Sequence, residues 1–338
     1  MTMNAYKPLL AITMGDPAGA GPEIVVKSLD TPEVREVCRG LVIGDTGVMR
    51  AAAEIVGIPM EVHSVSSADE MRSGDRIMNV LDLKDVDLSA LVRGRVSAAA
   101  GKAAYEAIEK GTMLTLQHVT DAIVTSALNK DALNQAGYHF PGHTQILAHL
   151  CGVRDAVMML TADALRIVHV STHVSLRDAC DLVTKERILR VMQLGVDATR
   201  AMGVEKPRVV VPGLNPHSGE GGLFGTEEEA QVIPAIEEAK GLGFDVRGPL
   251  PPDTAFLRAY RGEFDLVIAM YHDQGHIPIK MVGFEKGVNV TLGLPIIRTS
   301  VDHGTVFGKA GKGTADPTSM IEAIKLAATM CRTRRQAG

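Results

Sequence analysis

The sequence predicts an α/β fold in which short strands alternate with helices. Two patterns support this: short apolar runs alternate with longer segments of helical period, and polar segments rich in Gly and Pro follow several of the runs. The chain has 338 residues, of which 46% are hydrophobic and 22% are charged. Such a chain can bury a core as two domains or one large α/β unit, without disulfides or a structural metal.

Six apolar runs are predicted to be strands. They cover residues 9–13, 41–43, 122–125, 167–170, 209–211 and 266–270. Three helices are expected from capping signals and helical periodicity. One is capped by Thr184 and ends near Gly203, one runs from residue 98 to 110 and stops at Gly111, and one runs from Pro317 to Met330.

Charge and composition exclude several functional classes. The net charge of −5 gives no basic field for nucleic acid, and the absence of Trp leaves few rings to stack on bases. The four cysteines form no CxxC pair, which is typical of reduced thiols in the cytoplasm. No apolar run is long enough for a signal peptide or a membrane span. We therefore expect a cytoplasmic protein that binds neither nucleic acid nor membranes.

Three histidines follow predicted strands closely, and ligands of α/β proteins bind at the carboxyl ends of strands. His173, His217 and His272 are therefore candidate ligands of a divalent metal. Neutral imidazole is a common metal ligand, and three such ligands leave positions open for substrate oxygens. Because their wide spacing matches no local metal motif, a hydrogen bond within its own loop is the alternative for each histidine.

Other polar residues in these segments have two interpretations. His276 lies four residues after His272, but Gly275 and Pro278 argue against a regular helix there, and hence against a zinc-protease pair. Asp16 and Glu23 in the first glycine loop could bind metal or substrate, or they could belong to an ordinary helix start. That loop lacks the Walker and Rossmann spacings.

A third group of candidates lies near the end of the chain. Lys280, Asn289 and Arg298 are threaded through apolar sequence, which suggests side chains directed into a cleft. Lys and Arg there would hold phosphate or carboxylate oxygens, with ion pairs as the alternative.

The motifs of the chain resemble those of the 4-hydroxythreonine-4-phosphate dehydrogenase family along essentially its whole length. In order, they are Gly15-Asp16-Pro17-Ala18-Gly19, Gly142-His143-Thr144, Thr172-His173, Gly213-Leu214-Asn215-Pro216-His217, Tyr271-His272-Asp273-Gln274-Gly275 and the segment 298–305. The number and order of these motifs make the resemblance specific.

The resemblance implies a fold like that of isocitrate and isopropylmalate dehydrogenases, with two interlocked α/β domains and a central cleft. The expected domains are residues 1–130 plus 275–338 on the nucleotide side, and residues 131–274 as an inserted domain with metal ligands and dimer contacts. The segment 303–317 looks like the dinucleotide-binding loop of those enzymes. The residues expected to bind NAD are His303, Gly304, Thr305, Gly311 and Asp316.

The resemblance also implies the roles of the remaining site residues. His173, His217 and His272 would bind a divalent metal (Zn, Mg, Mn or Co), with His272 coming from the other subunit of a homodimer. The active site would then be shared across the dimer interface. The residues expected to bind the phosphorylated substrate are His143, Thr144, Lys280, Asn289 and Arg298. Asp253 and Asp273 would act as catalytic acid/base groups or hold the other site residues.

Segments 129–133, 140–144 and 276–280 look more like the catabolic branch of the family, which oxidises 4-phospho-D-threonate and 4-phospho-D-erythronate. The vitamin B6 branch typically has His where this chain has Asn129, and Gln145 replaces a common Glu. The implied reaction is NAD-dependent oxidation at C3 followed by loss of CO₂, which gives dihydroxyacetone phosphate.

Three alternatives remain at this point. The first is the biosynthetic enzyme acting on 4-phosphooxy-L-threonine. The second is a metal-dependent hydrolase or phosphotransferase that reuses the three histidines, and the third is a non-catalytic protein that binds sugar phosphates.

Overall fold

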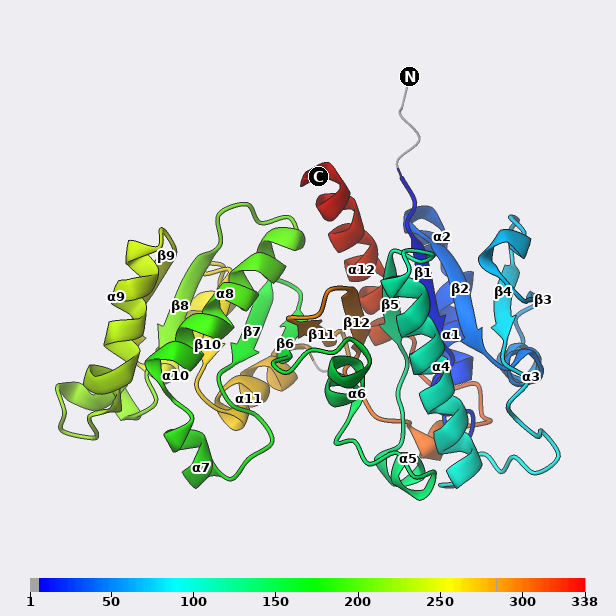
Figure 1. Cartoon of the computed structure of the whole chain (residues 1–338), viewed down its shortest axis with the longest axis horizontal. Helices are drawn as coiled ribbons and strands as arrows, with labels where there is room; N and C mark the ends of the chain where they lie inside the picture. The colour runs from blue at the N-terminus through cyan, green and yellow to red at the C-terminus, as the bar shows by residue number, and fades with distance from the viewer. Residues whose placement is uncertain (1–5, 284, 338) are drawn as a thin grey trace. The chain divides into compact units, whose positions relative to one another are not determined.

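The computed structural model describes residues 6–283 and 285–337 and confirms an α/β chain (Figure 1). The chain divides into two compact units. Unit 1 contains the residues up to Ala156 and those from Leu294 onward, and unit 2 is Val157–Gly293. These units differ in extent from the expected domains, because α5 and α6 pack on α4 of unit 1, whereas β11 pairs with β6 of unit 2.

Unit 1 is built on a parallel sheet with the strand order β3-β4-β2-β1-β5-β12 (Figure 1). The strands are Leu9–Thr13 (β1), Arg39–Gly44 (β2), Glu61–Val65 (β3), Ile77–Asp82 (β4), Ala122–Thr125 (β5) and Ile297–Val301 (β12). The central strand β1 is buried at every position, as expected for a parallel strand covered on both faces.

Helices cover both faces of this sheet. They are Gly21–Asp30 (α1), Pro32–Val37 (α2), Thr46–Val56 (α3), Ala98–Leu116 (α4), Lys130–Gln135 (α5), His143–Leu150 (α6) and Thr318–Ala337 (α12), with 3-10 turns Ala68–Glu70 (η1) and Phe307–Lys309 (η4). On one face α4 joins a core with Ala11, Ile43 and Ile123. On the other, α1 contacts α3 and α12.

Unit 2 is built on a mixed sheet with the order β11-β6-β7-β10-β8-β9. The strands are Val157–Ala162 (β6), Leu165–His169 (β7), Arg208–Pro212 (β8), Asp245–Leu250 (β9), Leu266–Ala269 (β10) and Val288–Leu292 (β11). Strand β6 is antiparallel to β7 and β11, whereas β7, β10, β8 and β9 run parallel to one another. The carboxyl ends of these four strands therefore share one edge.

The helices of unit 2 also pack on both faces of its sheet. They are Leu176–Asp181 (α7), Lys185–Ala201 (α8), Ile233–Gly241 (α9), Pro252–Tyr260 (α10) and His272–Gly283 (α11), with irregular turns Pro216–Glu220 (η2) and Glu228–Val232 (η3). Phe256 of α10 and Ile279 of α11 join one core with Ile167 and Val267. Helix α8 packs against α9 and against β7 and β10.

The structure confirms the six predicted strands to within a few residues and also the helix cap, where the Thr184 side chain accepts a hydrogen bond from the Arg187 N–H. The predicted end of the second helix at Gly111 is wrong. Helix α4 continues to Leu116, and Gly111 lies inside it. Glycine at this position allows α4 to pack closely on β5, since a Cβ there would lie 2.9 Å from the Ile123 side chain.

The expectation that Gly275 and Pro278 prevent a helix is also wrong, since both lie within α11. A Cβ at Gly275 would lie 2.4 Å from His169 Nε2, so glycine permits the close approach of this helix to β7. Tertiary packing thus overrides weak helix propensity here. Among the described residues, no helix has the length and apolar character needed to cross a membrane.

Glycine at position 101 allows the closest contact between α4 and α5, since a Cβ there would lie 2.2 Å from the Ala132 backbone. We expect Gly101→Ala to lower the free energy of unfolding by about 1–3 kcal/mol, because backbone atoms must move. The matched control is Gly241→Ala, where a Cβ meets open space, and it should stabilise slightly through helix propensity. Urea denaturation of both variants measures this; equal stabilities would contradict the close contact.

Candidate functional site

The shared carboxyl edge of unit 2 carries five of the predicted site residues, one of which is Asp273, the residue after His272. His173 lies in the segment after β7, His272 begins α11 after β10, His217 lies in η2 after β8, and Asp253 lies at the start of α10 after β9. Because β7, β10, β8 and β9 are neighbours in that order, these segments follow one another along the edge. Turn η2 also contacts α10. The topology therefore accounts for how distant histidines come to the same side of the sheet.

A row of histidine rings starts at this edge and runs into the protein. The His173 and His272 rings lie 5.8 Å apart between centroids, and the His272 ring stacks on that of His276 at 3.6 Å. His276 Nδ1 lies 3.1 Å from Nε2 of the buried His169. Burial and the neighbouring His272 lower the pKa of His276 to about 4, and burial holds the pKa of His169 well below its usual range. These inner rings are neutral at pH 7.

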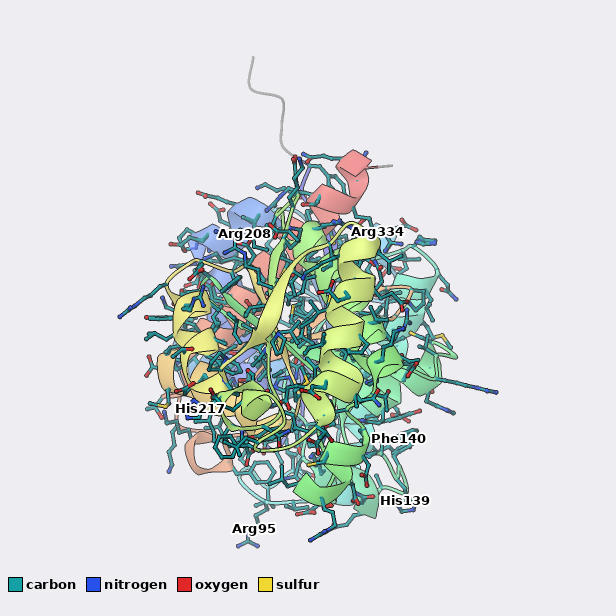
Figure 2. The ribbon with its side chains drawn as sticks, turned by 90° about the vertical axis from the view of Figure 1, so that its left-hand side faces the viewer. Arg95, His139, Phe140, Arg208, His217 and Arg334 are labelled. Atoms are coloured by element: carbon teal, nitrogen blue, oxygen red, sulfur yellow. The ribbon has the colours of Figure 1, made fainter. Side chains whose placement is uncertain are left out.

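His217 is held in an unusual backbone conformation. Its φ is 53° and that of Ser218 is 57°, a left-handed region that few residues other than Gly adopt. Its ring lies 6.3 Å from that of Phe224 (Figure 2 labels His217 on its loop). Such strain at a strand end often marks a functional segment.

The loop that carries His217 is fixed by a buried carboxylate that sequence reasoning missed. Glu228, 2% exposed, accepts hydrogen bonds from the Asn215 backbone N–H and side-chain amide, each at 2.8 Å. Gln274 ties this loop to α11, because its side-chain N–H donates to the Gly213 carbonyl at 2.8 Å. No sequence signal distinguishes Glu228 from its exposed neighbour Glu229.

Within the described residues, no group of three or more His, Cys, Asp or Glu side chains is arranged to hold a metal ion. The donor types nevertheless fit a divalent metal. His173 and His272 are neighbours, and Asp273 Oδ1 lies 2.6 Å from His272 Nδ1. A carboxylate at Nδ1 leaves Nε2 as the ligating atom, which is the usual arrangement for a metal-binding histidine.

A cavity of about 280 Å³ opens beside these two histidines. It is lined by Thr172, His173, Val174, Leu176, Ala179, Tyr271, His272 and Asp273. Of the two predicted acid/base residues, Asp273 thus lines the cavity, while Asp253 is exposed at the start of α10. Lys280 on α11 and Asn289 on β11 are half-buried and also belong to unit 2.

Unit 1 holds the remaining predicted substrate residues around a buried guanidinium. Arg298 is 2% exposed, and its NH2 group donates to Thr125 Oγ1 at 2.7 Å. Burial lowers the pKa of Arg298 to about 9, and burial together with that guanidinium holds the pKa of His143 well below its usual range. His143 and Thr144 begin α6, and His143 Nε2 is a buried atom with no hydrogen-bond partner among the described residues. A buried cation beside a neutral imidazole whose Nε2 has no partner among the described residues suits an anionic ligand.

The predicted dinucleotide segment also lies in unit 1. The Thr305 carbonyl accepts from the Ala20 N–H at 2.9 Å, and Asp316 caps α12 by accepting from Thr318 N–H at 2.8 Å. His303 Nδ1 lies 2.8 Å from the Gly304 carbonyl, while its Nε2 is buried without a partner in the described part of the chain. That unpartnered nitrogen is compatible with a bound cofactor.

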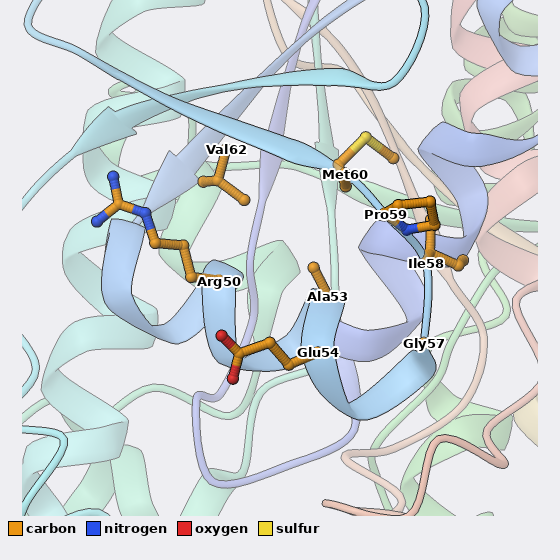
Figure 3. Close-up of a pocket in the computed structure, with 8 residues that line it drawn as sticks. All are labelled: Arg50, Ala53, Glu54, Gly57, Ile58, Pro59, Met60 and Val62. Atoms are coloured by element: carbon orange, nitrogen blue, oxygen red, sulfur yellow. The ribbon is translucent and has the colours of Figure 1, made fainter.

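Another pocket, of about 590 Å³, lies between the end of α3 and β3 (Figure 3). Its charged lining residues are Arg50 and Glu54, and the rest are apolar side chains and Gly57. It contains none of the predicted site residues and no arrangement suited to acid/base or metal chemistry.

Comparisons with known proteins identify the family of the chain. Residues 36–327 match the family described as "Pyridoxal phosphate biosynthetic protein PdxA". The D-threonate 4-phosphate dehydrogenase of Cupriavidus necator is 48% identical over 334 residues, which cover 98% of this chain and 100% of that protein.

Two solved structures are similar over almost the whole chain. One is a 4-hydroxythreonine-4-phosphate dehydrogenase from Klebsiella pneumoniae, with a TM-score of 0.88, 42% identity and coverage of 98% of this chain and 100% of the other. The other is a 4-hydroxythreonine-4-phosphate dehydrogenase from Burkholderia phymatum, with a TM-score of 0.84, 48% identity and coverage of 96% and 98%.

Asp16 is a buried carboxylate in the first glycine loop, and its burial lowers the stability of the folded protein by an amount that depends on pH. It is 1% exposed, and burial raises its pKa to about 6. The unfolded pKa is about 3.9, so the charged form costs stability above pH 6, and this cost is relieved as the pH falls towards about 4. We expect Asp16→Asn, which can still accept from Ala18 N–H, to raise the free energy of unfolding by about 1–3 kcal/mol at pH 8.

The gain should shrink from about pH 6 and disappear by about pH 4 in urea denaturation curves, because the wild-type carboxyl of the folded protein takes up a proton over this range and no longer carries a buried charge. The matched control is Asp87→Asn, since the exposed Asp87 accepts from Ser89 and its pKa is lowered. A gain for Asp16→Asn that does not change with pH would contradict the assignment.

Proposed function

Because the chain belongs to the PdxA family, we propose that it is a metal-dependent, NAD-linked dehydrogenase of 4-phospho-D-threonate or 4-phospho-D-erythronate. It would oxidise C3 and release CO₂ and dihydroxyacetone phosphate. The observation that carries the proposal is the order β7-β10-β8-β9, which aligns the segments of His173, His217 and Asp253 along one edge and sets His272 on the same edge, from which it would serve the site of the partner subunit. The Cupriavidus necator relative, named for D-threonate 4-phosphate, supports this choice of substrate.

His173, His217 and His272 are the residues that would hold the divalent metal, for which Zn, Mg, Mn and Co are the candidates. When bound, the metal would lower the pKa of a substrate hydroxyl and stabilise the enolate formed on loss of CO₂, while NAD would accept the C3 hydride. Because His169 and His276 are neutral at pH 7, they add no positive charge next to the proposed metal ligands.

Asp273 and Asp253 would handle protons. Asp273 Oδ1 already accepts from His272 Nδ1, so this carboxylate orients the ring and lines the adjacent cavity. Asp253 is exposed and can exchange protons with water. The hydroxyl proton that is lost on oxidation and the proton that is gained after decarboxylation would pass through these two carboxyl groups.

The substrate phosphate and carboxylate would be bound by His143, Thr144, Lys280, Asn289 and Arg298. Arg298 is the principal anchor, because a buried guanidinium held by Thr125 offers fixed donors to an anion. These contacts position the substrate and take no part in bond making. On the cofactor side, His303, Gly304, Thr305, Gly311 and Asp316 would contact NAD.

We further propose a homodimer in which His272 of the partner subunit completes the metal ligands and the active site is shared across the interface. Exposed apolar side chains beside the candidate site support this. Leu176 on α7 is 64% exposed, and Ile277 and Met281 on α11 are 57% and 81% exposed. Apolar groups that gather beside a site favour burial by another protein surface. We place the enzyme in the cytoplasm, where its four free cysteines would stay reduced.

A second candidate is oxidation of 4-phosphooxy-L-threonine in vitamin B6 synthesis. It is favoured by the family description and by the names of the two solved structures. The substrates differ at C2, where an amine replaces a hydroxyl. Asn129, which separates the two branches in sequence, serves here as the cap of α5 by accepting from the Ala132 N–H at 2.8 Å.

The decisive test is NADH formation by the purified protein with a defined divalent metal and each of three substrates. We expect 4-phospho-D-threonate or 4-phospho-D-erythronate to exceed 4-phosphooxy-L-threonine in kcat/KM by at least about tenfold, which is about 1.4 kcal/mol. Dihydroxyacetone phosphate should accumulate in equal amount with NADH. Preference for the amino acid would replace the proposal with the biosynthetic alternative.

Removal of one ligand should abolish turnover without unfolding the chain. We expect His217→Ala to lower kcat by about 100-fold or more and to reduce the bound metal measured after dialysis, because a ligand is lost. His63→Ala is the matched control, since His63 lies in unit 1 and its Nε2 bonds the Glu70 carbonyl at 3.1 Å. Near-normal activity and metal content of His217→Ala would remove this residue from the ligand set.

A further inference from the structure

We propose that Glu23 and Lys27 of α1 are positioning residues that fix the segment 309–315 for dinucleotide binding, an inference that rests on the proposed function. The glycine-rich stretch before them, Gly15 to Pro22, matches no nucleotide fingerprint. Its role, on this view, is to bring α1 against the later segment that contacts the cofactor.

Glu23 is buried in the first turn of α1, with 2% of its surface exposed. Its two carboxylate oxygens accept separate hydrogen bonds from backbone N–H groups of the segment. Oε1 accepts from Gly311 at 2.5 Å, and Oε2 accepts from Gly313 at 2.8 Å. A carboxylate with one donor on each oxygen sets both the distance and the orientation of these two glycines.

Lys27 lies one helical turn later and binds the same segment through its carbonyl groups. Its Nζ donates to the Gly313 carbonyl at 2.5 Å and to the Ala315 carbonyl at 2.8 Å. Residues four apart on a helix lie on the same face. Glu23 therefore binds backbone N–H groups of the segment, and Lys27, on the same face of α1, binds its carbonyl groups.

The backbone N–H groups of residues 309–313 all donate hydrogen bonds within the protein. Lys309, Ala310 and Lys312 donate within the turn, to the carbonyls of Val306, Phe307 and Lys309. Gly311 and Gly313 donate to Glu23. A phosphate therefore cannot be cradled by the N–H groups of residues 309–313 as it is in a P-loop. Within residues 309–313, contacts to a cofactor would therefore come from side chains, carbonyl groups and the shape of the backbone that α1 holds in place.

Two further contacts hold the neighbouring part of the segment. The Ala20 N–H donates to the Thr305 carbonyl at 2.9 Å, and a Cβ at Gly19 would lie 2.8 Å from the same oxygen. Glycine at position 19 thus permits the close approach that brings α1 into reach. Gly311 and Gly313 have φ of 77° and 66°, which other residues rarely adopt.

The experiment compares Glu23→Gln and Lys27→Met with wild type in steady-state kinetics and in calorimetric titration with NAD. In Glu23→Gln an NH₂ group faces a backbone N–H, and Lys27→Met keeps the side-chain length without its donors. We expect both to raise the KM and Kd for NAD at least about tenfold, with kcat and the substrate KM within about twofold. Hydrogen exchange at residues 311–313 should also accelerate.

Matched controls are Glu33→Gln, at an exposed position of α2, and Lys110→Met, at an exposed position of α4. Both should keep wild-type values. Unchanged NAD binding by Glu23→Gln and Lys27→Met would overturn the inference, as would equal losses in kcat, both KM values and thermal stability. If wild type binds NAD but oxidises none of the three substrates, the proposed function fails, while weaker NAD binding by the variants still supports the positioning role.

Discussion

Parallel strand pairing is the constraint on which the site depends. In unit 2 the pairs β7 with β10, β10 with β8, and β8 with β9 all run in one direction, so every following segment leaves from the same edge. Residues as far apart as His173 and His272 are therefore neighbours. The antiparallel strand β6 ends the parallel run and carries none of the candidate ligands. If any one of these parallel strands ran in the opposite direction, the residue that follows it would lie at the other edge of the sheet, away from the other candidate site residues.

The second requirement is that each buried charge is matched to a particular partner. Arg298 is held by Thr125, Glu228 by Asn215, and Glu23 by two glycine N–H groups. Removing ions from water is costly, and fixed donors or acceptors offset much of that cost only in one geometry. Asp16 and Asp85 differ, because Oδ2 of Asp16 and both carboxylate oxygens of Asp85 are buried with no hydrogen-bond partner among the described residues, and burial raises the pKa of both groups. Because carboxylates with raised pKa values cluster at functional sites, the loop of Asp16 is a candidate for such a site.

The α/β class and six of the strands could be predicted because fully buried parallel strands leave uninterrupted apolar runs, as in β1, β5 and β10. Strand β3 could not, because it is partly exposed and includes Glu61 and His63. The candidate metal ligands could be identified in the sequence because each is a histidine that closely follows an apolar run. Thr125 and His169 were missed because their roles depend on contacts with Arg298 and His276, more than a hundred residues away. Spacing along the chain carries no trace of such pairs.

The same reasoning explains why a glycine-rich motif near the amino terminus need not bind the ligand itself. In a P-loop, glycines expose N–H groups to phosphate. Here, glycines at positions 15 and 21 make room for Ser126, whose Oγ would lie 2.8 Å from a Cβ at either position. Gly19 makes room for Thr305 in the same way. The motif thus joins β1 to the loops that follow β5 and β12. Its glycines permit close packing between backbone segments, and Glu23, which follows them, holds the backbone of Gly311 and Gly313.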